Sequence, residues 1–174
     1  MVKHETEYDV SDATDYDPHL ACSLEGQIAN VADELAYTAH DLDGGLRSGM
    51  LTPRMLEGVS LWEILTDQTK WRGPELEEVA RHKLIRQLIG MEVTDLITST
   101  DAKLKESGAK SPLDIQKLSY NVIGFSEEMN RRNRELKDFL YNKMYRHYRV
   151  MRMQVKAEQF ITELFNAYCE EPAI

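Results

Sequence analysis

The stretch that decides the fold is residues 23–48, SLEGQIANVADELAYTAHDLDGGLRS. Successive residues of an α-helix lie about 100° apart around the axis, so apolar residues three or four positions apart share one face. Ser23 is a suitable N-cap, and the pair Gly44–Gly45 offers a helix stop. The stretch therefore predicts an amphipathic helix over 23–48, whose apolar stripe comprises Ile28, Val31, Leu35, Ala39, Leu42 and Leu46.

The polar side of this helix is unusual in its residue types. Asp33, Tyr37 and Asp41 follow one another at intervals of four, so they lie on one face, with His40 beside them. The polar face of most amphipathic helices simply contacts solvent. Carboxylates and an aromatic hydroxyl on one face also suit a metal ion and a sugar.

A resemblance to a known family favours the second interpretation. Residues 29–51, ANVADELAYTAHDLDGGLRSGML, resemble the third metal-site helix of the HD-domain deoxynucleoside triphosphate triphosphohydrolases, the bacterial dGTPase-like family. In that family the motif A-D-[DE]-[IL]-A-Y-x-x-H-D-x-[DE]-[DG] supplies the last metal ligand from its first Asp. The resemblance implies that Asp33 is the metal ligand and that Tyr37 and Asp41 contact the deoxyribose.

The dipeptide His40–Asp41 spells HD, but the resemblance does not make it the metal-binding pair. In the family, the ligating His and His-Asp, and commonly a catalytic His, lie upstream on earlier helices. This chain shows only the final Asp of the set. We therefore expect the C-terminal part of a family member, with its catalytic residues upstream and without activity when alone.

A basic segment, residues 134–150 (RELKDFLYNKMYRHYRV), is the second informative stretch. It resembles the family pattern L-K-x-F-L-x-x-x-x-Y-x-H-x-x-V, which implies that Lys137 lies near the substrate phosphates and Tyr145 near the nucleoside. A Lys ammonium suits a triphosphate, and an aromatic ring suits a base or sugar face. A solvated basic helix with Tyr145 half-buried remains open, as does binding of single-stranded nucleic acid.

Composition restricts the class of protein. The 174 residues are 42% hydrophobic and 29% charged, as in soluble globular proteins, and the formal charge is −9. The acidic balance disfavours nucleic acid as the partner of the whole chain, although residues 131–156 hold nine Lys or Arg against two acidic residues. Two cysteines, Cys22 and Cys169, and no long apolar run indicate a cytoplasmic protein with free thiols and no membrane partner.

The periodicity predicts an all-α fold, a multi-helix bundle of the HD-domain type. Residues 1–22 form an acidic surface segment in which His4 is exposed, and residues 23–174 form one helical domain. Its main parts are the helix 23–48, a long helix at about 74–107 and a basic helix at about 126–169 with a bend near 149–154.

The shorter segments complete this prediction. Thr52–Pro53 opens a short helix to about 58, and Ser60 caps another. Trp62 and Trp71 are expected to be packing anchors. Residues 119–126 are the only β-like run, too short for a sheet. A solvated basic face is the simplest interpretation of Arg81, His82, Lys83 and Arg86, and phosphate contact is the alternative.

The resemblance implies a reaction in which a dNTP and water give a deoxynucleoside and tripolyphosphate. It requires a divalent metal such as Mg or Mn, and family members are commonly homo-oligomers, some with a nucleotide activator. Two alternatives stay open. The chain could be a non-enzymatic helical module that binds nucleotides or single-stranded nucleic acid through residues 131–156, or an interaction domain that oligomerises through its long helices.

Overall fold

The computed structural model describes residues 20–73 and 75–172, and throughout these ranges the fold is all-α, as predicted. Most of the predicted acidic segment 1–22, including His4, lies outside the described residues, as does Pro74. The elements are α1 (Leu24–Arg47), the 3-10 turn η1 (Pro53–Leu56), α2 (Ser60–Thr69), α3 (Glu78–Ser107), α4 (Pro112–Gln116), α5 (Glu127–Leu140), the π-helical turn η2 (Tyr141–Tyr145) and α6 (Tyr148–Glu170).

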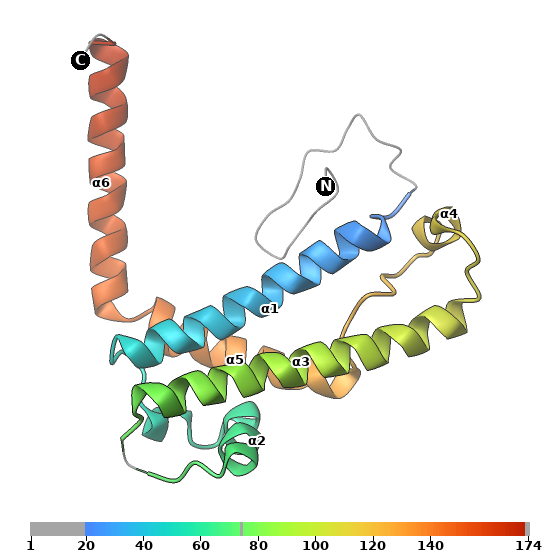
Figure 1. The fold of residues 1–174 in the computed structure, drawn as a ribbon. Helices are drawn as coiled ribbons and strands as arrows, with labels where there is room; N and C mark the ends of the chain where they lie inside the picture. Colours follow the sequence, from blue (N-terminus) through green and yellow to red (C-terminus); the bar gives the residue numbers. More distant parts are fainter. Residues whose placement is uncertain (1–19, 74, 173–174) are drawn as a thin grey trace.

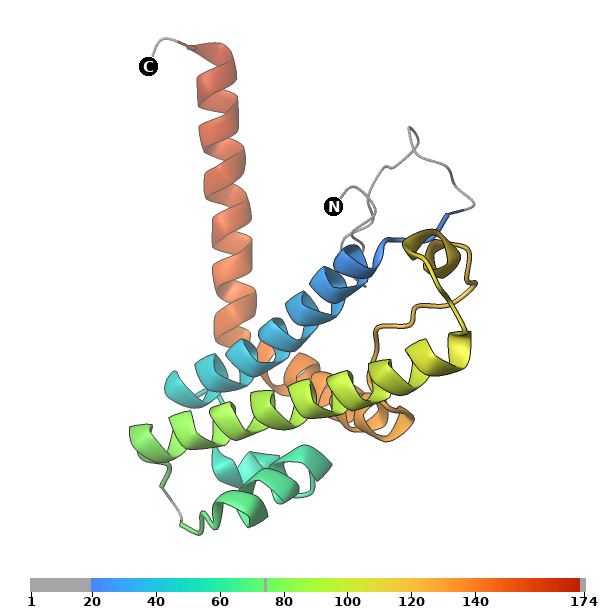
Figure 2. The same cartoon turned by 45° about the vertical axis from the view of Figure 1, so that its right-hand side comes forward.

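The bundle is built on α1 and α3, which lie side by side and run in opposite directions (Figures 1 and 2). Helix α2 packs against α3, and α5 contacts both α1 and α2. The core between them holds buried apolar side chains from every one of these elements. Its fully buried leucines are Leu42, Leu51, Leu56, Leu61, Leu65, Leu84, Leu88, Leu136 and Leu140.

Helix α1 begins as predicted but ends later than the glycine pair. The Ser23 hydroxyl accepts a hydrogen bond from the Gly26 N–H at 3.3 Å, which confirms the N-cap. The helix runs to Arg47, within the predicted range 23–48, so the Gly44–Gly45 pair does not stop it. Gly45 instead permits close packing: a Cβ added there would lie 2.5 Å from Leu51 Cδ1.

The predicted apolar stripe of α1 holds in its centre and fails at its start. Leu35, Ala39 and Leu42 are buried, but Ile28 is 52% exposed. Gln27 is buried in its place because its amide oxygen accepts hydrogen bonds from the N–H groups of residues 122 and 123, at 3.0 and 3.2 Å. Residues 122 and 123 belong to the run 119–126 that was predicted to be β-like, but this segment is irregular. Their N–H groups donate to a side chain of α1 rather than to a neighbouring strand.

The two tryptophans pack as predicted. Trp62 is buried, Trp71 is partly buried, and their rings meet edge-to-face with centroids 5.9 Å apart. Ser60 is the first residue of α2 rather than its cap. Its N–H donates instead to a Glu135 carboxylate oxygen at 3.2 Å, so α5 satisfies this helix start.

Helix α3 begins at Glu78, four residues later than predicted, and ends at Gly108 with a positive φ of 64°. The prediction that Arg81 belongs to a solvated basic face was wrong. Arg81 is buried, and its Nε lies 3.1 Å from an oxygen of Asp43 on α1, so this ion pair attaches the start of α3 to the end of α1. His82, Lys83 and Arg86 are exposed, as expected.

The predicted basic helix over 126–169 is two helices. Helix α5 starts at the cap Ser126, whose hydroxyl accepts from the Met129 N–H at 3.2 Å. The chain then passes through η2 and breaks at residues 146–147, slightly before the predicted bend. Helix α6 stands away from the bundle in both views (Figures 1 and 2), and none of its residues is buried.

Candidate functional site

The polar face of α1 lies beside α5 and η2, and this contact gathers the predicted site residues. Asp33 and Asp41 are half-buried, whereas Tyr37, one turn from each, is 64% exposed. His40 is exposed. The predicted metal ligand and sugar contacts therefore share one accessible face of a helix whose opposite side is buried in the core.

Tyr145 joins this face through a hydrogen bond. Its hydroxyl donates to a carboxylate oxygen of Asp41, although the two residues are 104 positions apart in the chain. Tyr145 ends the π turn η2, in which the Arg146 N–H bonds to the Tyr141 carbonyl five residues back. Such wide turns change the direction in which side chains leave a helix. Here the turn brings the predicted nucleoside contact to the predicted sugar contact.

Lys137 also contacts this face, through a carboxylate that was not among the predicted site residues. Its ammonium forms an ion pair with the carboxylate of Glu34, the neighbour of Asp33. The two side chains are 24% and 47% exposed. In this structure the predicted phosphate-binding cation is therefore paired with a carboxylate, and an anion that binds Lys137 competes with Glu34 for the ammonium.

Glu92 on α3 is a charged residue inside the bundle near this ion pair. It has no exposed surface, and neither carboxylate oxygen has a hydrogen-bond partner among the described residues. Burial raises the pKa of Glu92 from 4.5 to about 8. The Asn133 amide and the Lys137 ammonium oppose that rise and the Glu34 carboxylate adds to it. At neutral pH the buried carboxyl is thus mainly protonated.

The described residues supply one carboxylate for the predicted metal rather than a complete site. Asp33 is accessible and has no ion-pair or hydrogen-bond partner within the described part of the chain. Within the described ranges no group of three His, Cys, Asp or Glu side chains could hold a metal ion. An Asp oxygen fits Mg or Mn chemically, but a stable site needs several further ligands.

Several cations in the basic segment are already occupied by protein groups. Arg132 lies 2.6 Å and Arg131 3.4 Å from a Glu128 oxygen, on the exposed side of α5. Arg146 lies over the Tyr141 ring at 5.1 Å. The positive charge predicted from the sequence is therefore partly neutralised.

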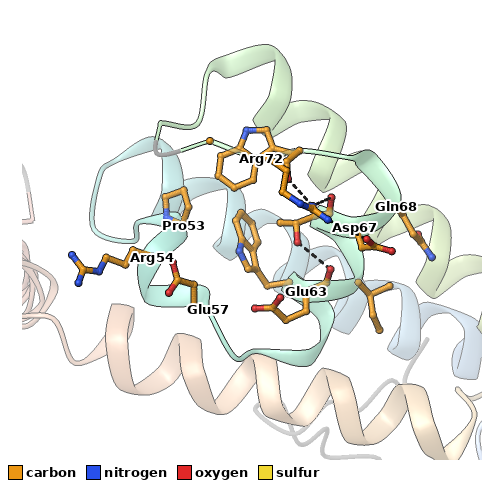
Figure 3. A pocket seen from close by; sticks show the side chains of 12 residues that line it. Pro53, Arg54, Glu57, Glu63, Asp67, Gln68 and Arg72 are labelled. Carbon is orange, nitrogen blue, oxygen red and sulfur yellow. Dashed lines mark hydrogen bonds and ion pairs between the residues drawn. The ribbon is translucent and has the colours of Figure 1, made fainter.

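Figure 3 shows a separate hollow of about 910 Å³. Its lining comes from η1, α2 and the segment after α2, and it contains none of the predicted site residues. At its rim Arg72 and Asp67 form an ion pair at 3.1 Å, with both side chains largely exposed (Figure 3). Its tryptophans act in packing, and nothing in the hollow resembles the predicted chemistry.

Comparisons with known proteins first define a class. Residues 123–174 match the model of the phosphohydrolase-associated domain, and they cover the end of the irregular segment, α5, η2 and α6. The chain is therefore related to phosphohydrolases through the segment that carries Lys137 and Tyr145. No helix in the described ranges is long and apolar enough to cross a membrane.

The particular family follows from whole-chain similarity. The chain is 38% identical to the deoxyguanosinetriphosphate triphosphohydrolase-like protein of Geobacter sulfurreducens over its full length, covering 46% of that protein. Over 87% of its length it is 40% identical to the deoxyguanosinetriphosphate triphosphohydrolase-like protein 1 of Deinococcus radiodurans, covering 41% of it. The predicted resemblance to this family is confirmed. The chain spans less than half the length of these relatives.

The structure brings the predicted residues Asp33, Tyr37, Asp41, Lys137 and Tyr145 together, and the sequence did not lead us to two carboxylates beside them. Glu92 follows Leu84 and Leu88 at intervals of four, so a charged residue in the centre of an apolar stripe was a visible signal. Glu34 had no such signal, because its partner Lys137 lies 103 residues away. The roles of the five predicted residues remain predictions.

Proposed function

We propose that a complete protein containing this chain hydrolyses dNTPs to deoxynucleosides and tripolyphosphate at a divalent metal site. In this proposal Asp33 is the last metal ligand, Tyr37 and Asp41 contact the deoxyribose, and Lys137 and Tyr145 contact the phosphates and the nucleoside. The observation that carries the proposal is the Tyr145–Asp41 hydrogen bond. It joins the two segments in which two separate family motifs imply substrate contacts.

Each residue has a defined task on this face. A metal ion bound at Asp33 and at ligands outside the described residues would polarise the α-phosphate and lower the pKa of a bound water. The Tyr145 hydroxyl orients the Asp41 carboxylate and leaves its second oxygen for a sugar hydroxyl. The exposed Tyr37 ring, one turn away, can pack on the sugar and reject a ribose by fit.

The ion pair of Lys137 supports a phosphate role because it is exchangeable. Lys137 and Glu34 are both partly exposed, so replacing the carboxylate by a phosphate costs little desolvation. The alternative of a nucleic-acid-binding module is less well supported, since Arg131 and Arg132 already have a carboxylate partner in Glu128.

The test is release of tripolyphosphate from dGTP and the other dNTPs with manganese, in the full-length protein. The Asp33→Ala substitution is expected to abolish turnover. The matched control is Asp101→Ala, which removes an exposed carboxylate from α3 and should leave activity unchanged. Normal activity of the Asp33→Ala protein would refute the ligand role.

A second substitution separates binding from chemistry. Tyr37→Ala should raise the KM for dNTPs about tenfold with a smaller change in kcat, because it removes a sugar contact worth about 1.4 kcal/mol. An unchanged KM would contradict the sugar contact. The 174-residue chain alone should show no turnover. If it instead binds single strands with a steep salt dependence that is indifferent to Asp33, the nucleic-acid alternative is correct.

A further inference from the structure

Helix α6 is amphipathic, and none of the other described helices covers its apolar side. It extends over 23 residues, none of them buried, and it leaves the bundle in a direction that neither α1 nor α3 shares (Figures 1 and 2). Its large side chains Phe160, Ile161 and Leu164 are each more than half exposed. Unpaired helices expose such a face rarely, because burying each large apolar side chain is worth about 1.5–3 kcal/mol.

The apolar residues of α6 follow a seven-residue repeat. Steps of three and four alternate along one seam, which is the spacing that a second helix fills by interlocking side chains. Met151 and Phe165 lie off this seam. The seam consists of Val150, Met153, Ala157, Phe160, Leu164 and Ala167.

The charges beside the seam select the orientation and identity of the partner. On one side of the seam, charged residues recur every seven positions and form a column along the helix. The column is positive in the first half of the helix and negative in the second half. The column reads Arg149, Lys156, Glu163 and Glu170. The other flank contains no charge, because it reads Gln154, Ile161 and Tyr168.

We propose that α6 pairs antiparallel with α6 of a second copy of this chain. In an antiparallel pair, like columns face each other. Arg149 then faces Glu170 of the second copy and Lys156 faces its Glu163. The two-fold symmetry repeats both contacts, giving four opposite-charge pairs.

The apolar seam gives the same register. With Ala157 opposite the second copy's Phe160, Met153 lies opposite Leu164 and Val150 opposite Ala167, so a small residue faces a large one in the central layers. A parallel pair would place the charged column against the uncharged one and gain none of these contacts. Both features therefore favour a second copy in antiparallel orientation.

The test uses charge reversals and sedimentation of the 174-residue chain over a concentration series. Lys156→Glu and Glu163→Lys each convert two attractive contacts into repulsive ones, so each should raise the dimer dissociation constant about tenfold. An equimolar mixture of the two variants should dimerise as well as the parent chain, because each reversed residue then faces an opposite charge. Arg152→Glu is the matched control, since it changes the same charge on the far side of α6 and should have no effect.

A variant in the seam measures the apolar contribution. Leu164→Asp should abolish the dimer and leave the bundle folded, because Leu164 is 57% exposed and lies on a helix that has no buried residue. A parent chain that sediments as a 20.1 kDa monomer throughout the series would overturn the proposal. So would a mixture of the two charge variants that associates no better than either variant alone, because the face would then serve another partner.

Discussion

Helices α5 and α6 follow one another in the chain and have opposite surroundings. Both are amphipathic, and both begin at a side-chain cap, Ser126 and His147 respectively. Helix α5 buries Met129, Leu136 and Leu140 against α1 and α2, whereas α6 buries nothing. An apolar stripe on a helix therefore predicts that another surface packs against it. It does not indicate whether that surface belongs to the same folded domain.

Truncating one leucine in the core and one on α6 is the strongest test of this difference in surroundings. Leu88 on α3 has no exposed surface, while Leu164 on α6 is 57% exposed. Leu88→Ala should lower the free energy of unfolding by about 2–5 kcal/mol, because it leaves a cavity in the core. Leu164→Ala should change it by less than about 0.5 kcal/mol at concentrations where the chain is monomeric.

Urea denaturation monitored by circular dichroism at low protein concentration measures both values. The two variants make the same chemical change, so they control for each other. A loss above about 1 kcal/mol for Leu164→Ala would show that α6 has an apolar contact within the monomer, contrary to the structure.

A second prediction concerns charge. The bundle buries Glu92 without a hydrogen-bond partner among the described residues, while the charged groups of α6 face solvent. The pKa of Glu92 is raised from 4.5 to about 8. Between these pH values the unfolded chain releases the proton and the folded chain keeps it, so this group lowers stability as the pH rises.

The Glu92→Gln variant removes that titration. Its free energy of unfolding, relative to the parent chain, should increase by about 3–4 kcal/mol between pH 5 and pH 8. Urea denaturation at the two pH values measures this change. Glu158→Gln on α6 is the control and should show no such increase. A difference between Glu92→Gln and the parent that is constant with pH would mean that the carboxyl is ionised in the fold.

The smallest expected effects come from two adjacent glycines of α1. A Cβ at Gly45 would lie 2.5 Å from Leu51 Cδ1, and Leu51 is buried and has little room to move. Gly45→Ala should therefore destabilise the bundle by about 1–3 kcal/mol. A Cβ at Gly44 would meet nothing within 4 Å, so Gly44→Ala should stabilise the helix by about 0.5–1 kcal/mol. Thermal unfolding of the two variants provides the measurement, and shifts of the same sign would contradict this packing.

The sequence predicted the local features of the fold well. Periodicity and capping placed α1, and the Thr52–Pro53 pair placed the short turn η1 ahead of α2. The errors arose at residues whose burial depends on contacts with distant parts of the chain. Gln27 is buried because residues 122 and 123 need an acceptor, and Arg81 is buried because Asp43 lies opposite. Neither partner can be identified from the local sequence.

The candidate site also combines features that the local sequence shows with features that depend on tertiary packing. Asp33, Tyr37 and Asp41 share a face because of helical spacing alone, which the sequence shows. Their association with Lys137 and Tyr145 depends on α5 and η2 folding back onto α1, and it was predicted only through the family resemblance. The π turn that directs Tyr145 to Asp41 has no sequence signature that we recognised.

The hydrogen bonds of the Gln27 side chain also affect the order in which the chain can fold during synthesis. Its amide nitrogen donates to the Cys22 carbonyl at 3.1 Å, and its oxygen accepts from residues 122 and 123. Nearby, the Ala21 N–H donates to the Gln116 carbonyl at 2.7 Å. A nascent chain cannot form the bonds to residues 116, 122 and 123 until those residues, 95 or 96 positions further along, have left the ribosome. The start of α1, the helix that carries Asp33, is thus synthesised early but gains its tertiary hydrogen bonds only late in synthesis.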